Sequence, residues 1–377
     1  MIFGAGEWGR MAYCYYKNVC DIVGYLDNDS RIWNTYIDGV PIYSPDFLKN
    51  NSVGIIVANK RYQKEIKEQL RKCYGIKEVV IFEIIESVWE LYDNDKIINN
   101  DQLIVSFSDG LGNQMFQYAL YCNLKSIGRN VKADLSAYSK PGMMPFVLEK
   151  VFPNIKLDLA NFHMKEIYQR NRNVYIEQPP NNIGKKVYDE SIFDMEVGYI
   201  EGYHTSYKYA ESIKKNLVND FKFYVNVDSE LNKFVNLEIK ENTVSVQVRR
   251  GDFLNSKNYR EIGCHCDEAY YKKAMDLMQQ KVPKAKFVFM SNDIEWVKAN
   301  LGHETDIFIE KKMFSNYQDW YDMYIMSKCK YNIIPNSTFG WWGAWLNMDP
   351  DKIVIAPKRW RTNWESTDWC PPDWILI

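Results

Sequence analysis

The sequence predicts an α/β fold built from parallel sheets. Apolar segments of strand length alternate with amphipathic segments of helix length, which is the pattern of βαβ units. Two glycine-rich turns, at residues 4–9 and 110–112, each follow a predicted strand and open a predicted helix. The chain has 377 residues, of which 46% are apolar, so it is long enough for two or three domains with buried cores.

The composition excludes several classes of function. With 47 basic and 49 acidic residues the chain is nearly neutral, which argues against a nucleic-acid-binding protein and requires any anion site to be local. It contains no apolar run of about 18 residues and no signal-peptide pattern, so we expect a cytoplasmic protein without a transmembrane segment. The eight cysteines form no paired CxxC units, and we expect no metal site.

The first glycine turn belongs to a dinucleotide-binding pattern. Gly4, Gly6 and Gly9 form a GxGxxG turn, and Asp27 ends a predicted strand about twenty residues later. Such a turn holds a pyrophosphate, and the acidic residue holds a ribose hydroxyl. The alternative is a scaffold or docking domain that binds no nucleotide, because only two residues precede Phe3 in the first strand.

The rest of this segment completes a small domain. Strands are predicted at 21–27, 54–58 and 78–82, with a charged helix at 61–72. We therefore predict a Rossmann-like accessory domain over residues 1–92, joined to the rest of the chain by a polar linker at residues 90–101. Its GAGxxG, YLDND and DGVPI segments resemble the amino-terminal domain of bacterial sugar O-acyltransferases.

One predicted strand, which contains Gln247, ends in a concentration of charge. Valines and polar residues alternate along it, as in a buried strand. Arg249 and Arg250 follow, and Gly251 permits a sharp turn that carries Asp252. Ligands bind at the carboxyl ends of strands in open α/β sheets, and the arginine fork matches phosphate oxygens, so this tip suits a diphosphate. The alternative is a salt-bridged surface turn without a ligand.

The second glycine turn follows a predicted strand at 104–107 and opens a helix. Its bare backbone amides, at Gly110 and Gly112, are expected to approach a substrate across a cleft together with Asn113 and Gln114. The alternative is a tight turn whose glycines only permit close packing.

Two further strands are predicted at 286–290 and 331–334, and polar residues follow both of them. These residues are Asn292 and Asp293 after the first strand, and Asn336, Ser337 and Thr338 after the second. The Asp293 carboxylate is placed to accept hydrogen bonds from the edge of a guanine base, or to cap the next helix. The second group places hydroxyls and helix-start amides near the same sheet edge. The tryptophans that follow, Trp341, Trp342 and Trp345, have the spacing of residues that pack on one helix face.

Three of these segments together resemble glycosyltransferase family 11, the α-1,2-fucosyltransferases. The segments are GLGNQMFQYA, QVRRGD and NSTFGWWGAWL, in the order that the family has them, and the resemblance covers roughly residues 101–377. The chain departs from the family pattern at three positions. Gln247 stands where the family has His, Asp109 where it often has Gly, and Gly340 where it usually has Ser.

The resemblance implies a fold and a division of labour. It implies a GT-B-like pair of facing Rossmann-like domains, with the accessory domain in front. Residues 101–240 would form the acceptor-side half, and residues 241–377 the half that binds the GDP-sugar donor.

The resemblance also implies an activity. A bacterial enzyme of this kind would move L-fucose from GDP-β-L-fucose to a galactose-containing oligosaccharide or lipid-linked glycan, with inversion, forming an α-1,2 linkage in surface polysaccharide synthesis. It would need no metal or other cofactor, and peripheral contact with a membrane is left open. Arg249 would stabilise the charge that develops on the leaving diphosphate, and Asp252 is the candidate general base.

Two alternatives are left open at this stage. Within enzymes, the fucose could go to another hydroxyl, or another GDP-sugar could be the donor. Outside enzymes, the chain could be a non-catalytic module that binds nucleotide sugars, because Gln247 replaces a histidine that can titrate near neutral pH.

Overall fold

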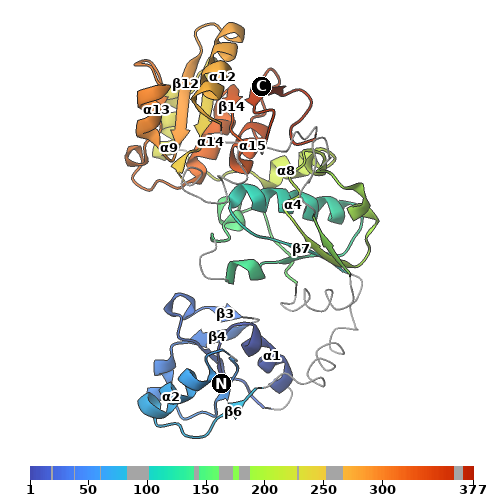
Figure 1. The fold of residues 1–377 in the computed structure, drawn as a ribbon, viewed down its shortest axis with the longest axis vertical. Helices are drawn as coiled ribbons and strands as arrows, with labels where there is room; N and C mark the ends of the chain where they lie inside the picture. Colours follow the sequence, from blue (N-terminus) through green and yellow to red (C-terminus); the bar gives the residue numbers. More distant parts are fainter. Residues whose placement is uncertain are drawn as a thin grey trace. The chain divides into compact units, whose positions relative to one another are not determined.

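The computed structural model describes eleven stretches of the chain, and every structural statement below refers to them. They are residues 1–17, 20–37, 39–59, 61–82, 102–139, 144–160, 173–177, 187–226, 229–251, 266–360 and 368–377. The chain forms two compact units, Met1–Asn100 and Asp101–Ile377, which are described separately (Figure 1). The predicted linker lies outside the described residues. No helix in the described stretches is both long enough and apolar enough to cross a membrane.

The first unit contains one six-stranded sheet of short strands. In chain order these are β1 (Ile2–Phe3), β2 (Tyr25–Leu26), β3 (Tyr36–Ile37), β4 (Val40–Tyr43), β5 (Ile56–Val57) and β6 (Val80–Ile81). The sheet order is β3-β4-β2-β1-β5-β6, and all neighbours are parallel except β3 and β4. The helices are α1 (Glu7–Tyr16) and α2 (Gln63–Tyr74), with 3-10 turns at Ser30–Ile32 and Pro45–Lys49. The strands and the charged helix predicted for this unit are confirmed, although most of the strands have only two residues.

The second unit begins with a four-stranded parallel sheet. Its strands are β7 (Leu103–Ser106), β8 (Val131–Asp134), β9 (Val174–Ile176) and β10 (Gly198–Glu201), in the order β8-β7-β10-β9. The helices around it are α4 (Leu111–Ser126), α5 (Leu148–Val151), α7 (Lys208–Glu211) and α8 (Lys214–Asp220), with 3-10 turns at Ser136–Ser139 and Glu190–Asp194.

Helix α4 is the central helix of this half. Most of its residues are buried, and it ends just before Gly128, which has a φ of 86°. A glycine in this left-handed conformation is the usual stop for a helix. Ile127, which follows the last helical residue Ser126, is 51% exposed.

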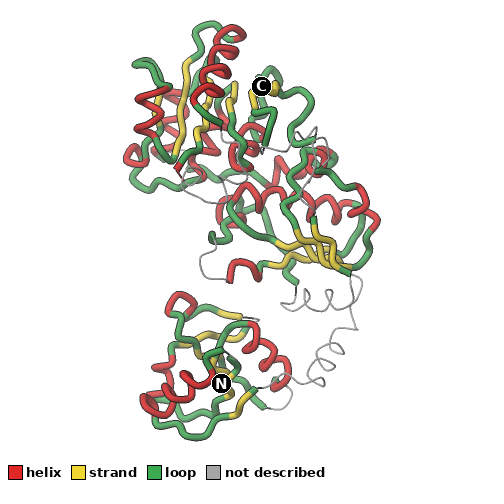
Figure 2. Tube along the Cα trace, in the orientation of Figure 1, coloured by secondary structure: helices red, strands yellow, loops and turns green. Residues whose placement is uncertain are grey.

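The remaining part of the second unit forms a six-stranded parallel sheet. Its strands are β11 (Thr243–Val248), β12 (Lys286–Ser291), β13 (Ile307–Phe308), β14 (Tyr331–Ile333), β15 (Val354–Ala356) and β16 (Ile375–Leu376), in the order β13-β12-β11-β14-β15-β16. Its helices are α9 (Glu230–Glu238), α12 (Glu268–Lys281), α13 (Ile294–Asn300), α14 (Trp320–Lys328) and α15 (Thr338–Trp345), with a 3-10 turn at Lys311–Met313. Figure 2 shows the strands of both sheets in yellow and the helices in red.

Strand β11 lies between β12 and β14, so the carboxyl ends of these three strands share one edge of the sheet. Both faces of β11 are covered, because α12 packs on one neighbouring strand and α14 packs on β11 itself. Its polar residue Ser245 is satisfied by Asn332 of β14, whose Nδ2 donates to the serine hydroxyl at 2.7 Å. The α/β fold with parallel sheets that the sequence predicts is confirmed.

The two sheets of the second unit share one core. The ring of Phe116 on α4 lies 4.7 Å from the ring of Trp341 and 4.9 Å from that of Trp342, both on α15. Both tryptophans are fully buried, and the Trp341 indole Nε1 donates to the Trp369 carbonyl at 2.9 Å. The prediction that these tryptophans pack in the core is therefore confirmed, and α4 and α15 hold the two halves together.

Candidate functional site

The turn after β11 is held by the end of β12. The side-chain Oδ1 of Asn292 accepts hydrogen bonds from the backbone N–H groups of Arg250, at 2.9 Å, and Gly251, at 3.3 Å. The two strand ends are thus tied together through a single amide. Asp252, predicted as the general base, lies outside the described residues.

Arg250 is fixed in place by an acid and an aromatic ring. Its Nε donates to Oδ2 of Asp293 at 3.3 Å, and its guanidinium lies 3.6 Å from the centre of the Trp296 ring. The other Asp293 oxygen accepts from the backbone N–H of Trp296 and so caps α13. The capping role predicted for Asp293 is confirmed, while 37% of its side chain stays exposed. Arg249, the first residue after β11, is half-buried beside this assembly.

The start of α15 supplies a buried hydroxyl. Ser337 is the residue that precedes the helix and is 2% exposed, and its Oγ finds no hydrogen-bond partner within the described stretches. Thr338 opens the helix and is half-buried. Asn336 bonds to the protein through both ends of its amide: its Nδ2 donates to the Trp360 carbonyl and its Oδ1 accepts from the Cys266 thiol. Its side chain therefore positions the helix start.

Gln247 reaches from β11 to α15. A Cβ placed on Gly340 would lie 2.0 Å from Oε1 of Gln247, so the amide occupies the space that any larger residue at 340 would need. This Oε1 is buried and has no partner in the part of the chain that the structure describes. Two of the three departures from the family pattern are therefore in contact with each other. The sequence gives no sign of that contact, because the two residues lie on different elements.

The second glycine turn lies against the start of α15. A Cβ on Gly112 would be 2.5 Å from the backbone nitrogen of Phe339 and 2.6 Å from the hydroxyl oxygen of Thr338. Gly110 precedes α4 in extended conformation, with no side chain capping the helix. The first turns of two helices from opposite halves thus meet here. Amides at helix starts and nearby arginines are groups that bind phosphate oxygens.

Two predicted residues of the glycine turn have different surroundings. Asn113 is half-buried. Gln114 is fully buried, and its amide is used by the protein itself. Its Nε2 donates to the carbonyls of Asp109 and Pro145, and its Oε1 accepts from the backbone of Val147 and Leu148. Gln114 therefore shapes the loop.

Sequence reasoning did not identify a second polar cluster, at the carboxyl ends of β7, β9 and β10. The Asp109 carboxylate accepts a hydrogen bond from the Tyr203 hydroxyl. Glu177 accepts from the backbone N–H groups of Tyr203, at 2.7 Å, and His204, at 3.1 Å. Burial lowers the pKa of His204, which is fully enclosed. Only the topology brings these residues together, because they follow three separate strands.

The glycine turn of the first unit is closed by its own acidic residue. Oδ2 of Asp27 accepts from the backbone N–H of Ala5 at 2.8 Å. A Cβ on Gly9 would lie 1.7 Å from the carbonyl oxygen of Gly4, and Gly4 has a φ of 108°. Gly6, in contrast, has open space where a Cβ would be. The turn thus requires glycine at Gly4 and Gly9, as the predicted pattern does. Its acidic residue, Asp27, accepts a hydrogen bond from the turn itself.

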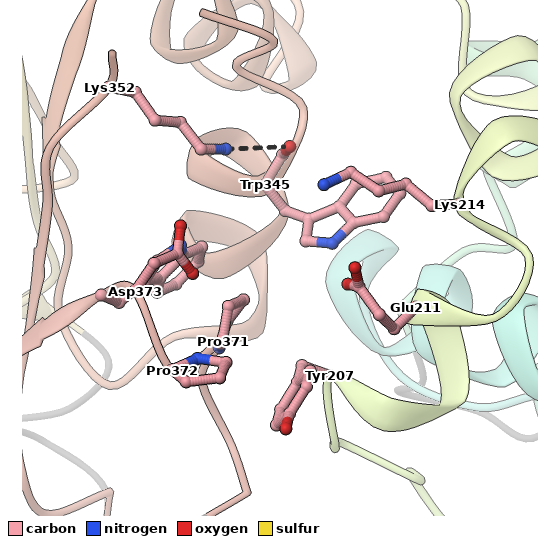
Figure 3. Close-up of a pocket in the computed structure, with 9 residues that line it drawn as sticks. Tyr207, Glu211, Lys214, Trp345, Lys352, Pro371, Pro372 and Asp373 are labelled. Atoms are coloured by element: carbon pink, nitrogen blue, oxygen red, sulfur yellow. Dashed lines mark hydrogen bonds between the residues drawn. The ribbon is translucent and has the colours of Figure 1, made fainter. Parts of the chain in front are cut away.

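A separate cavity of about 340 Å³ lies at the other end of α15 (Figure 3). Tyr207, Glu211 and Lys214 line one side, and Trp345, Lys352 and the segment 371–374 line the other. Lys352 donates to the carbonyls of Ala344 and Asn347, at 2.9 and 2.7 Å, and so satisfies the end of the helix. Burial lowers the pKa of Lys352 to about 8. None of the predicted site residues lines this cavity.

Within the described stretches, no group of three or more His, Cys, Asp or Glu side chains is arranged to hold a metal ion.

Comparison with known families gives two matches. The profile of glycosyl transferase family 11 matches residues 76–377, and that of the C2185-like N-terminal domain matches residues 1–82.

Three relatives show how far the similarity extends. An alpha-1,2-colitosyltransferase of Escherichia coli is 29% identical over 73% of this chain and 98% of its own length. The O-antigen biosynthesis glycosyltransferase WbnK of Escherichia coli is 31% identical over 43% of this chain and 50% of its own length. The human galactoside alpha-(1,2)-fucosyltransferase 1 is 32% identical over 30% of this chain and 31% of its own length. Among solved structures, the fucosyltransferase NodZ from Bradyrhizobium gives a TM-score of 0.40 with 12% identity, over 65% of this chain and 93% of that chain.

Proposed function

Because the chain belongs to glycosyltransferase family 11, we propose that it is an inverting fucosyltransferase. It moves L-fucose from GDP-β-L-fucose to a galactose-containing glycan in the cytoplasm, forming an α-1,2 linkage in the synthesis of a surface polysaccharide. The relatives with α-1,2 activity support the linkage. Residues 101–240 act on the acceptor side and residues 241–377 bind the donor, while residues 1–92 are accessory.

One observation carries the donor site: the arginine tip of β11 and the open start of α15 lie at the same sheet edge, and the second glycine turn lies against that helix start. Transfer breaks the bond between the anomeric carbon and the β-phosphate oxygen, so negative charge develops on the leaving diphosphate. Charge-assisted hydrogen bonds from Arg249 and Arg250 stabilise that charge, as do the amides and hydroxyls of Ser337 and Thr338.

The preorganisation of Arg250 supports this assignment. Its guanidinium is stacked on Trp296 and paired with Asp293, and 16% of its side chain is exposed. A charge that is already fixed needs little reorganisation when the leaving group develops its own charge. We propose that Asp293 also uses its exposed edge to accept from the guanine base.

Gln247 is proposed to act as a neutral hydrogen-bonding group near the nucleotide. Its buried Oε1 lacks a partner within the described stretches, and a buried amide oxygen without a hydrogen bond is costly. An N–H or hydroxyl of the donor would remove that cost. The buried hydroxyl of Ser337 also lacks a partner within the described stretches, and a hydrogen bond to the donor would remove that cost.

A second candidate donor is GDP-colitose. An alpha-1,2-colitosyltransferase is the relative that spans most of this chain. Colitose differs from L-fucose by the loss of the 3-hydroxyl, so a site that bonds this hydroxyl would reject colitose. A site with an apolar contact there would favour it.

The test is a transfer assay with purified full-length protein, labelled donor and a panel of β-galactosides. We expect transfer from GDP-L-fucose, retained in EDTA, and a product that is cleaved by α-1,2-specific fucosidase. Faster transfer from GDP-colitose would favour the second candidate. Absence of transfer from every GDP-sugar, in a protein that binds GDP, would favour the non-catalytic module.

A further inference from the structure

We propose that the Asp109 carboxylate, oriented by the Tyr203 hydroxyl, accepts the proton of the acceptor hydroxyl during glycosyl transfer. This inference rests on the proposed function and assigns to it a catalytic residue of this chain, at a position where the family often has Gly.

Asp109 has a backbone conformation that favours glycine. Its φ is 61°, in the left-handed region that costs an ordinary residue roughly 1 kcal/mol. The conformation is held by two hydrogen bonds to its carbonyl, from the Tyr138 hydroxyl at 3.1 Å and from Nε2 of Gln114 at 2.8 Å. The loop is therefore built to keep this residue in place despite the strain. Strained residues held in this way concentrate at functional sites.

The carboxylate of Asp109 keeps most of its hydrogen-bonding capacity. Its Oδ2 accepts from the Tyr203 hydroxyl, and within the described stretches this is its only hydrogen bond. No lysine or arginine of those stretches forms an ion pair with it. An ionised carboxylate has about four acceptor positions, so room is left for a substrate hydroxyl. One fixed partner sets its direction.

Asp109 also belongs to the glycine turn that meets the start of α15. It follows the end of β7, the neighbour of β10 in the sheet, and Tyr203 follows the end of β10. Three residues further along, Gly112 is in contact with the start of α15 at Thr338 and Phe339. The carboxylate thus belongs to the turn that faces the proposed diphosphate site. An acceptor bound at the carboxyl edge of the sheet formed by β7 to β10 would present its hydroxyl between the Asp109 carboxylate and the proposed diphosphate site.

Other carboxylates near this edge are engaged. Glu177 accepts from two backbone amides, those of Tyr203 and His204. Asp134 is buried and accepts from Ser136 and from the Tyr199 hydroxyl. Both hold loops together. Asp109, in contrast, has acceptor positions left within the described stretches, so its position and hydrogen bonding suit a base.

The step balances without a further reactant. The acceptor oxygen forms a bond to the anomeric carbon, and the bond from that carbon to the β-phosphate oxygen breaks. The electron pair of the broken bond leaves on GDP. The hydroxyl proton passes to Asp109, which later loses it to water. Because the acceptor oxygen attacks the face opposite the leaving group, the configuration at the anomeric carbon is inverted.

The experiment compares four full-length proteins: wild type, Asp109→Asn, Asp109→Gly and Asp276→Asn. Asp276 is an exposed carboxylate on α12 and serves as the matched control. We expect kcat to fall about 100-fold or more in both Asp109 variants, and to be unchanged in the control. GDP binding by calorimetry should be unchanged in all four. Asp109→Gly should fold at least as well as wild type, because glycine fits a φ of 61°.

Two further readouts separate a base from a structural residue. The fall of kcat/KM at low pH in the wild type should disappear in Asp109→Asn, and added formate should partly restore transfer by Asp109→Gly. Tyr203→Phe should lower kcat by less than either Asp109 variant. Asp109 variants with kcat within about twofold of wild type would overturn the assignment while leaving the transferase intact. A wild type that transfers no sugar would overturn both.

Discussion

The two glycine turns of this chain look alike in sequence and are used differently. Each follows the first strand of its sheet and opens a helix. The residue before the helix is an extended glycine, Gly6 or Gly110, and no side chain caps the helix. In the first unit, Asp27 of the same unit accepts from the turn at Ala5. In the second unit, the turn lies against another helix start, at Thr338.

The group that a glycine turn contacts therefore determines what the turn can bind. A turn whose amide is bonded by its own domain has less to offer a phosphate group, whereas a turn that meets a second helix start adds to a positive site. We therefore expect the second turn to serve the donor and acceptor, and the first turn to maintain the accessory fold.

The largest effects are expected when one methyl group is added to each glycine turn. Gly9→Ala would put a Cβ 1.7 Å from the Gly4 carbonyl oxygen, and Gly112→Ala would put one 2.5 Å from the Phe339 nitrogen. Because both neighbours are backbone atoms, we expect each change to cost about 3 kcal/mol of stability in its own unit. Thermal unfolding and transfer rates should separate the two: Gly112→Ala should lose transfer, and Gly9→Ala should keep it.

Gly6→Ala is the control for both changes, since nothing lies within 4 Å of its Cβ position. It should alter neither stability nor transfer. Equal loss of transfer in Gly9→Ala and Gly112→Ala would show that the two turns act together, against the comparison.

Arg249→Lys tests the arginine tip that the second turn is proposed to face. Lysine keeps the charge but lacks the planar fork, so we expect a loss of about 2 kcal/mol in transition-state stabilisation, or roughly 30-fold in kcat/KM. Steady-state kinetics with GDP-L-fucose measure this directly. An unchanged kcat/KM in a folded variant would remove Arg249 from the mechanism.

The contact between Gln247 and Gly340 gives a smaller effect. In Gly340→Ala the new methyl group meets Oε1 of Gln247 at 2.0 Å, but this is the far end of a flexible side chain, so we expect a cost of about 1 kcal/mol. Gln247→Ala should remove that cost, and a double-mutant cycle measured by denaturant unfolding reports the coupling. Additive effects of the two changes would contradict the contact.

Gln247→His addresses the family difference at this position. Because Gly340 leaves room beside residue 247, we expect the histidine to be tolerated, with GDP affinity within a few-fold of wild type. Loss of GDP binding by calorimetry would place Gln247 away from the ligand.

A change in the first turn is expected to lower stability slightly and to leave transfer unaffected. Asp27→Asn weakens the hydrogen bond that Ala5 donates, and we expect a loss of about 1 kcal/mol in the stability of the first unit with transfer unchanged. If NAD, a nucleotide sugar or coenzyme A instead stabilises the protein by a thermal shift that Asp27→Asn abolishes, then the first turn binds a nucleotide after all.

Sequence patterns predict the long elements well. The segments that became β11 and β12 each span six residues, and both were expected as strands within a few residues of their observed bounds. Among the strands of two or three residues, β9, β13, β15 and β16 were not predicted. Their pairing depends on strands far away in the sequence.

The candidate site was partly predictable for a similar reason. Residues at strand ends and helix starts, such as Arg250, Asn292 and Ser337, are marked by their local sequence. The pairing of Asp109 with Tyr203 depends on β7 and β10 being neighbours, which no local pattern encodes. Local sequence also gives no sign that the Gln114 side chain, in the same motif, braces the loop.

Hydrogen–deuterium exchange of the full-length protein, with and without GDP, tests the central claim most directly. We predict slower exchange on GDP binding in peptides that cover residues 110–114, 249–251 and 336–340, with no change in peptides that cover residues 4–9. Protection at residues 4–9, or none at 249–251 and 336–340, would contradict the account.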